Sequence, residues 1–325
     1  MSLPAISVRS LVKRYVKAKA NAVDGVSFDV PRGQIFGLLG PNGAGKTTII
    51  GVLTIGIVPT EGSATVMDVD VVRDPIEVKR RIAVVPQQSN LDRSLKVREV
   101  LTFHAAYHGV PRREREERAD RLLDELGLGE RKNEKVTRYS GGMAQRLMIA
   151  RALMHAPDVL FLDEPTNNLD PQSRLFLWER IRALNARGIT ILLTTHDMDE
   201  ADKLCDHIAV MDHGKILVND TPAALKMMIP GGTALEVRAH ADGAGSRERI
   251  AAAFGALPGV TKVDALEDAD AAGALTYRVY ADSVNAQIGP AAQAVLAAGA
   301  EVRDLSVKQP SLEEVFIFLT GRQLR

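Results

Sequence analysis

The feature that most constrains the fold of this chain is a glycine-rich loop that matches the pattern G-x-x-x-x-G-K-[ST] in full. Its residues are Gly40, Pro41, Asn42, Gly43, Ala44, Gly45, Lys46 and Thr47. An apolar run at residues 34–39 precedes the loop and is typical of a strand buried on both faces, and a helix is predicted to begin near Gly45. Glycines let backbone N–H groups turn toward one point, because no Cβ obstructs a phosphate there. The sequence therefore predicts an α/β fold with a phosphate-binding loop between a strand and a helix.

The side chains at the end of the loop predict how it binds a nucleoside triphosphate. Lys46 is expected to reach the β- and γ-phosphates, Thr47 to bind Mg²⁺, and Thr48 to approach the α-phosphate. The N-terminus of the helix adds roughly half a positive charge at the same place. We therefore expect the whole loop, together with Thr48, to hold the phosphates.

A second chemical element is a hydrophobic run at residues 159–162 that ends in two carboxylates, Asp163 and Glu164. Successive side chains of a strand point to opposite sides, so the two acids are expected to take different roles. Asp163 is placed to hold Mg²⁺, usually through water, and Glu164 to polarise the attacking water as general base. The nucleotide is predicted to be ATP, since a guanine-specific Asn-Lys-x-Asp run is absent. These two elements alone also fit a kinase, a GTPase or a helicase.

The rest of the first two thirds of the chain extends the α/β pattern. Residues 5–65 alternate as strands and turns around one helix, and residues from about 92 to 156 have helical spacing. Short buried strands return at residues 159–162 and 189–193, with a helix at 172–186 between them. Continuous apolar strands in strand–helix–strand order indicate a parallel sheet that is covered on both faces.

A domain boundary is predicted at Pro230-Gly231-Gly232, which separates residues 1–229 from residues 233–325. The second region is alanine-rich, and its alternating and helical segments predict a small α+β domain of βαββαβ order. An amphipathic helix is expected to follow, with Leu312, Val315, Phe316 and Leu319 on one side. No catalytic constellation occurs there, so we expect a dimerisation or stability module in preference to a ligand sensor.

Composition excludes several classes of protein. Lys and Arg number 41 and balance 41 Asp and Glu, so no overall charge draws the chain to nucleic acid or anionic lipid. The one cysteine, Cys205, excludes an intrachain disulfide and a cysteine-rich metal site. The start of the sequence lacks the pattern of a secretory signal, and no apolar stretch approaches the ~18–20 residues of a spanning helix. A protein that is soluble by itself is therefore expected.

A third motif decides among the nucleotide-binding classes, because it is a second helix start built to bind an anion. It consists of a serine suited to N-capping followed by two glycines that open the backbone. In sequence it reads Tyr139-Ser140-Gly141-Gly142-Met143-Ala144-Gln145-Arg146. This run resembles the signature motif of the ABC ATPases, with Met in place of the usual glutamine. In that family two ATPase domains dimerise head to tail, so the resemblance implies that Ser140 and Gly142 contact the γ-phosphate bound by a second copy, with Gly141 in the same nucleotide-binding motif.

The resemblance implies roles for residues in four further motifs, and these motifs occur in the family's order. Gln87 matches the glutamine that touches Mg²⁺ and water and signals to the membrane partner, with Gln88 as the adjacent alternative. Asp170, in Asn168-Leu169-Asp170, matches the loop that crosses the dimer interface. His196 matches the switch histidine that holds the γ-phosphate, and Tyr15 matches the aromatic residue that stacks on adenine, on position alone.

The similarity covers residues 1–229 and implies a P-loop NTPase core with a mixed sheet and a helical subdomain at about 92–156. It further implies an ATP-hydrolysing subunit that drives a separate multi-span membrane permease from the cytoplasmic face of the cell membrane. The region after residue 229 looks like that of bacterial exporters of drugs and nodulation factors, which favours export. The alternative is a soluble ABC ATPase that acts on ribosomes or nucleic acid. That class is disfavoured because the chain has one ATPase module, no long coiled-coil insertion and no basic stripe.

Overall fold

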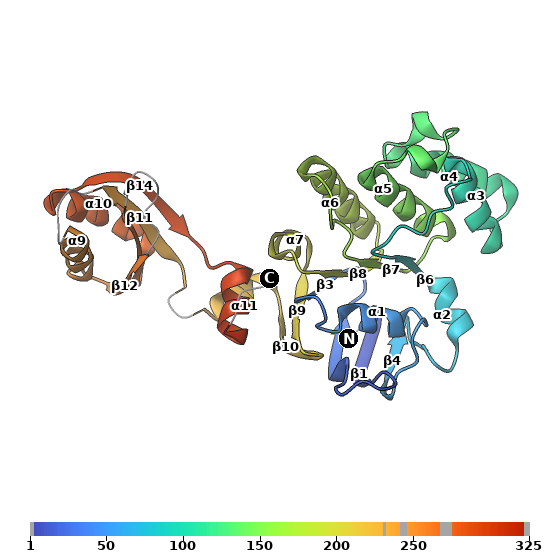
Figure 1. Cartoon of the computed structure of the whole chain (residues 1–325), viewed down its shortest axis with the longest axis horizontal. Helices are drawn as coiled ribbons and strands as arrows, with labels where there is room; N and C mark the ends of the chain where they lie inside the picture. The colour runs from blue at the N-terminus through green and yellow to red at the C-terminus, as the bar shows by residue number, and fades with distance from the viewer. Residues whose placement is uncertain (1–2, 230–231, 241–245, 267–274, 322–325) are drawn as a thin grey trace. The chain divides into compact units, whose positions relative to one another are not determined.

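The computed structural model describes residues 3–229, 232–240, 246–266 and 275–321. It divides into two compact units, one up to Pro222 and the other from Ala223 onward (Figure 1). Two sheets lie in the first unit and one in the second, and each unit has its own hydrophobic core.

The first unit is organised around a six-stranded sheet whose strand order is β10-β9-β3-β8-β7-β6. Adjacent strands from β9 to β6 run parallel, and β10 pairs antiparallel with β9 at the edge. Every residue of β3, β7 and β8 is buried, as expected for apolar strands covered on both faces. The strand bounds are β3 Ile35–Leu39, β6 Ile82–Val85, β7 Val159–Asp163, β8 Thr190–Thr195, β9 His207–Asp212 and β10 Lys215–Asp220.

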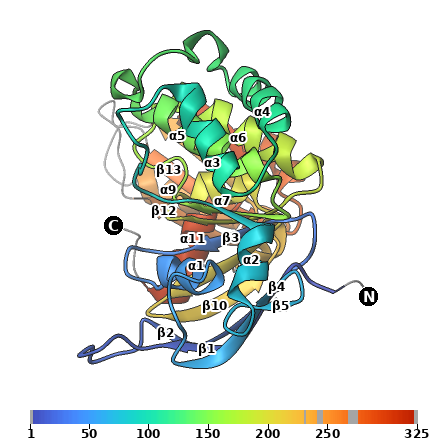
Figure 2. The same ribbon diagram turned by 90° about the vertical axis from the view of Figure 1, so that its right-hand side faces the viewer.

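A second, antiparallel sheet of the same unit has the strand order β2-β1-β4-β5. Its strands are β1 Ile6–Lys13, β2 Val23–Val30, β4 Glu61–Val66 and β5 Val69–Asp70. Helix α1 (Lys46–Leu53) lies between this sheet and the central one (Figure 1, Figure 2). One hydrophobic cluster joins the three layers, with Ile49 of α1 packed among Val8 of β1 and Phe161 of β7. That packing holds the start of α1 firmly against the sheet.

The helices on the other side of the central sheet include the segment for which the sequence predicts helical spacing (Figure 1). The helices there are α3 Val97–Tyr107, α4 Arg112–Glu125, α5 Gly141–Ala152 and α6 Pro171–Ala186, and the short α7 is Met198–Leu204. Leu122 and Leu147 are buried, while the charged pairs of α4, such as Arg112 with Glu116, lie on its solvated face. Helix α2 (Pro75–Arg81) leads directly into β6.

The second unit contains a four-stranded antiparallel sheet of order β12-β13-β11-β14. Its elements follow the predicted βαββαβ order, and a final helix closes the described chain. Tyr277 and Phe254 pack edge to face at the centre of its core. The elements are α8 Pro222–Met227, β11 Ala234–His240, α9 Ser246–Gly255, β12 Val260–Leu266, β13 Leu275–Ala281, α10 Ile288–Ala297, β14 Glu301–Lys308 and α11 Leu312–Thr320.

The described residues also bear on the two remaining predictions about long elements. In the residues that the structure describes, no helix is long and apolar enough to cross a membrane. The predicted amphipathic tail is α11, which buries Leu312, Val315 and Phe316 while Leu319 is half-buried. The residues of the predicted boundary at 230–231 lie outside the described part of the chain.

Candidate functional site

The site lies where the parallel strands of the central sheet end. The register pairs Leu39 with Thr195 between β3 and β8, and Asp163 with Thr194 between β7 and β8. Consequently the segments that follow these strands emerge side by side, although they lie far apart in sequence. Ligands of parallel α/β sheets bind outside these carboxyl ends.

The glycine-rich loop turns from β3 into α1 through backbone shapes that need glycine. Gly43 and Gly45 have φ angles of +84° and +102°. A Cβ on Gly45 would lie 2.4 Å from the carbonyl oxygen of Ala22, and one on Gly40 would lie 2.3 Å from that of Met211. Gly45 is also the N-cap of α1 and has no side chain that accepts from the first turn. The N–H groups of that turn are thus left to an external anion.

Lys46 is the cation of the loop and is only 4% exposed. Its Nζ donates to the carbonyl oxygens of Gly40 at 2.6 Å and Pro41 at 3.1 Å, and lies 3.7 Å from Oε1 of Glu164. Burial lowers the pKa of Lys46, and the charges of Glu164 and Asp163 oppose that shift. The ammonium group is therefore held inside the loop, where the oxygens of a phosphate can replace the carbonyls.

Asp163 is the last residue of β7 and faces the start of α1. Its Oδ1 accepts hydrogen bonds from the hydroxyls of Thr47 at 3.3 Å and Thr194 at 2.6 Å. A carboxylate beside a hydroxyl is a donor set of hard oxygens, which is the kind that Mg²⁺ prefers. The two residues that the sequence predicts as metal ligands on the loop and on the acidic strand are therefore adjacent.

Glu164 corrects one step of the sequence argument. The strand ends at Asp163, and Glu164 lies beyond it with φ at +48°, in the left-handed region. Its N–H donates to both the carbonyl oxygen and the hydroxyl of Thr194, each at 3.1 Å. The two acids are thus separated by a left-handed turn and not by strand alternation. Such a conformation costs of order 1–3 kcal/mol for a residue other than glycine, and it clusters at functional sites.

Four side chains converge on the carboxylate of Glu164, which is itself 8% exposed. Gln87 and Asn167 donate to its Oε2 from amide nitrogens at 2.8 and 3.0 Å. Nδ1 of His196 lies 3.3 Å from Oε1, and Nζ of Lys46 lies 3.7 Å from the same oxygen. A buried carboxylate needs such partners, because burying an unpaired charge is expensive. Three of the four partners, Lys46, Gln87 and His196, are residues that the sequence singles out.

The structure places the Ser140 motif at the start of α5. Oγ of Ser140 accepts from the N–H of Met143 at 3.3 Å, which is the predicted N-cap. A Cβ on Gly142 would lie 2.8 Å from Oγ of Ser173, so that glycine also permits close packing against α6. The N–H of Tyr139 donates to the carbonyl oxygen of Val136, and the Arg146 guanidinium lies 4.6 Å from the centroid of the Phe176 ring. Among the described residues, no hydrogen bond joins this motif to the phosphate loop of the same chain.

The two remaining predicted residues have local structural contacts as well. Asp170 is the N-cap of α6 and accepts from the N–H of Ser173 at 2.9 Å, and the hydrogen bonds from Ser173 lower its pKa. Asn168, two residues earlier, has φ at +60°, a conformation that Asn tolerates well. Tyr15 is 44% exposed, and its hydroxyl lies 3.3 Å from that of Thr48 at the start of α1.

Sequence reasoning missed the supporting residues, above all Glu200 on α7. Glu200 is 1% exposed, and its Oε1 accepts from Thr166 Oγ1 at 2.8 Å and Trp178 Nε1 at 3.1 Å. Burial raises the pKa of this carboxyl group. Thr166 follows Glu164 by two residues, so Glu200 ties the loop after β7 to the helices behind it. The available signal was an acid next to Ala201 on the face of α7 that buries Leu204.

Comparisons with known proteins bear on this geometry. The family model described as "ABC transporter" matches residues 23–167, which include the phosphate loop, the Ser140 motif and both acids. The daunorubicin/doxorubicin resistance ATP-binding protein DrrA of Streptomyces peucetius is 42% identical over 98% of this chain and 92% of its own. A Nod factor export ATP-binding protein I of Burkholderia thailandensis is 39% identical over the full length of both chains.

Solved structures resemble the ATP-binding part of the chain. An ATP-binding subunit of an ABC transporter superposes with a TM-score of 0.63 at 30% identity, over 69% of this chain and 92% of that one. The ATP-binding cassette MJ0796, captured as a post-hydrolysis dimer with ADP and phosphate, gives 0.61 at 26% identity. That match covers 66% of this chain and 98% of the other.

Proposed function

Because the chain belongs to the ATP-binding subunits of the ABC transporters, we propose that its ATP hydrolysis is catalysed at Glu164 and drives export through a separate membrane permease. The fold is that of the ABC ATPases, and the family is one that hydrolyses ATP. Beyond this family assignment, we propose roles for individual residues, a bound Mg²⁺ ion, a dimer and a permease partner.

One observation carries the assignment of the base. One buried carboxylate, that of Glu164, is within reach of Lys46, Gln87 and His196. These three residues follow three different strands, β3, β6 and β8. A general base has to stand within one hydrogen bond of the proton that it removes. Glu164 then takes the proton from the attacking water, and Gln87 and His196 orient that water and the γ-phosphate.

The phosphates are held by the chain's own groups. Lys46 exchanges the carbonyls of Gly40 and Pro41 for phosphate oxygens, and the N–H groups at the start of α1 add their partial charges. Thr47 and Asp163 supply the oxygens for Mg²⁺, which when bound neutralises negative charge between the phosphates. Tyr15, beside Thr48, is positioned to cover the adenine.

We propose further that two copies pair head to tail, so that each Ser140 motif completes the other copy's site. The support is that this capped helix start, with two adjacent glycines, has its described contacts away from the phosphate loop of its own chain. A similar ATP-binding cassette has been captured as a dimer with ADP and phosphate. In this arrangement Ser140, Gly141 and Gly142 bind the γ-phosphate and Asp170 lies at the dimer interface.

Export is supported by relatives that span the chain. The full-length matches are a drug-resistance protein and Nod factor export proteins, so an exported small molecule or glycan is the cargo class that we propose. The partner is then a multi-span permease, and the subunit acts at the cytoplasmic face of the membrane. These relatives do not favour a soluble ATPase that acts on ribosomes or nucleic acid. Residues 233–325 form an accessory domain in this proposal, and the division of the structure near Pro222 supports a boundary there.

The decisive experiment replaces the base. Glu164→Gln keeps the shape and the contacts with Gln87 and Asn167 but cannot accept a proton, so ATP turnover should fall roughly 10²–10⁴-fold. ATP binding should remain, and size-exclusion chromatography with ATP should show a stable dimer. Glu179→Gln, at an exposed position of α6, is the matched control and should leave turnover unchanged. Turnover near the original rate in Glu164→Gln would contradict the assignment of the base.

A further inference from the structure

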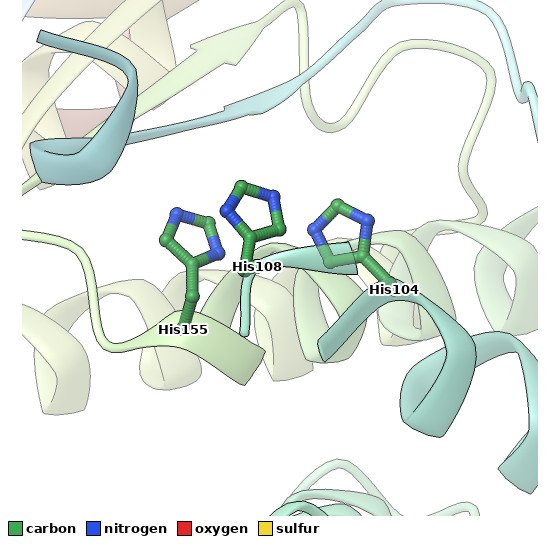
Figure 3. Close-up of side chains that lie close together, drawn as sticks. All are labelled: His104, His108 and His155. Atoms are coloured by element: carbon green, nitrogen blue, oxygen red, sulfur yellow. The ribbon is translucent and has the colours of Figure 1, made fainter. Parts of the chain in front are cut away.

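Three histidines meet outside the ATP site. His104 lies in the last turn of α3, His108 caps the end of that helix, and His155 ends the 3₁₀ turn η3 (Leu153–His155) that follows α5. One ring nitrogen from each lies within 4.8 Å of the others. Figure 3 shows the three imidazoles side by side. His108 and His155 are stacked, with centroids 4.0 Å apart, and His104 is 4.7 Å from His108.

The spacing on α3 suits a metal. Residues four apart lie on one face of a helix, and histidines at i and i+4 are a recurrent pair of zinc ligands. Three nitrogens bound to one Zn²⁺ at about 2.0–2.1 Å are separated by roughly 3.4 Å. The ligand nitrogens lie within 4.8 Å of one another, and the stacked, nearly parallel rings of His108 and His155 would rotate so that their in-plane lone pairs converge on the ion.

The third histidine is already oriented by a second contact. Nε2 of His155 lies 2.8 Å from the carbonyl oxygen of Ile82 in β6, and because a carbonyl only accepts, Nε2 carries the proton. Nδ1 then carries the lone pair, and within the described part of the chain this buried atom has no hydrogen-bond partner. Metal-binding histidines almost always donate their other N–H to a carbonyl or carboxylate in this way. His155 thus presents an unsatisfied acceptor to the cluster.

Burial disfavours the charged, protonated form of each of the three imidazoles. Burial is the largest cause that lowers the pKa of His104, to about 4, and the nearby His108 and Arg151 lower it further. Burial likewise lowers the pKa of His108 and of His155.

The surroundings select the kind of cation. The histidines line a cavity of about 840 Å³ between α2, β6, α3 and the end of α5. No acidic side chain is among the described residues that line it, whereas Lys79, Arg80 and Arg151 are. Hard cations such as Mg²⁺ and Ca²⁺ require oxygen ligands, which the three imidazoles do not supply. Imidazole suits Zn²⁺, Cu²⁺, Ni²⁺ and Co²⁺.

We propose that His104, His108 and His155 bind one transition-metal dication of the Zn²⁺ class, with the fourth position open to the cavity. The site does not depend on the proposed ATPase residues. It joins α3 to η3 and, through the carbonyl of Ile82, to β6, which ends at Val85 shortly before Gln87. A bound ion therefore links the helical segment to the strand that leads into the ATP site, and it should raise the melting temperature.

The test measures metal binding directly. The full chain, purified with a tag that contains no histidine, is titrated with Zn²⁺ by calorimetry, without nucleotide and in a buffer with excess Mg²⁺ to cover Asp163. We expect one ion per chain, and Co²⁺ should give the visible absorption of a tetrahedral nitrogen site. Cys205 does not compete, because it is buried and burial raises its thiol pKa far above the usual range.

Variants separate this site from incidental binding. His108→Gln, at the exposed member, should weaken Zn²⁺ binding at least roughly ten-fold, since loss of even an outer partner of a ligand costs roughly 10–100-fold. Variants His104→Gln and His155→Gln should do the same, and the triple variant should lose the cobalt spectrum. The matched control is His240→Gln in the other unit, which should bind Zn²⁺ unchanged. Circular dichroism of each variant without metal confirms that it is folded.

Two results would overturn the proposal. One is the absence of saturable Zn²⁺ binding by the wild-type chain. The other is a folded triple variant that binds Zn²⁺ with the affinity of the wild type and gives the same cobalt spectrum. The ion would then occupy a different site.

Discussion

At the scale of single residues, the site depends on groups that hold Glu164 in an unfavourable backbone conformation. Its φ is +48°, and its N–H is bound by Thr194 while Asn167 donates to its carboxylate. Thr194 also donates to Asp163. One threonine thus positions both acids, which explains how two adjacent carboxylates serve different partners.

Glu200 offers a prediction at this scale, because its carboxylate is buried and the pKa of this group is raised. Between its unfolded and folded pKa values the folded state holds more protons than the unfolded state. The free energy of unfolding therefore falls as pH rises through that window. Glu200→Gln keeps the acceptor for Thr166 and Trp178 but cannot ionise. Urea unfolding at several pH values should show that the free energy of unfolding of this variant increases relative to that of the wild type as pH rises.

The control for that measurement is Glu200→Ala. It leaves the donors of Thr166 and Trp178 buried without a partner, at a cost of roughly 1–3 kcal/mol each at every pH. A difference between wild type and Glu200→Gln that is constant with pH would contradict the raised pKa of this carboxyl group.

At the scale of elements, the starts of two helices perform related tasks. Helix α1 begins at a glycine with no side-chain acceptor, so its first N–H groups are available to phosphate. Helix α5 begins at Ser140, whose hydroxyl already accepts from Met143. The same hydroxyl is proposed to contact ATP bound by a second copy, so its structural and functional roles have to be separated by experiment.

Two substitutions at Ser140 make that separation. Ser140→Ala removes the cap of α5 and should cost about 1 kcal/mol of stability, whereas Ser140→Asn retains a capping oxygen and should cost little. If the hydroxyl contacts the γ-phosphate in trans, both variants should lose ATP-dependent dimerisation in a Glu164→Gln background. Melting temperature and size-exclusion chromatography with ATP measure the two effects. Normal dimerisation of Ser140→Asn together with failure of Ser140→Ala would assign to Ser140 a capping role alone.

At the scale of the whole molecule, the chain combines an ABC ATPase unit with a second α+β unit, and its relatives share nearly this full length. None of the described helices has the length and apolar character needed to span a membrane. The permease partner that we propose is therefore a prediction about the assembled protein.

The assembly is tested by purification from native membranes. Glu164→Gln with ATP should be trapped as a closed dimer, so mild-detergent extraction should recover a stoichiometric integral membrane protein, identified by mass spectrometry. The same extraction without ATP should recover less of it. Ribosomal proteins or nucleic acid in place of a membrane partner would contradict the transporter assignment at this scale.

The helices and strands were largely predictable, because each follows from the sequence pattern within its own segment. Apolar runs gave the buried strands β3, β7 and β8, and the order of the second unit followed from alternation. The strand alternation that the sequence analysis applied to Asp163 and Glu164 was wrong, because pattern alone does not report the left-handed turn at Glu164. The three histidines were not predicted as a group, since His104 and His155 are far apart in sequence.

The sequence by itself determined the chemistry of the loop. Glycines at set positions followed by Lys46 and Thr47 have a consequence within a few residues, because backbone freedom and a helix N-terminus are local properties. The tertiary structure alone decided which side chains surround Glu164, why Glu200 is buried, and that three imidazoles share one cavity. Those facts arise from strand order and helix packing, which bring distant segments together, and no short pattern in the chain encodes them.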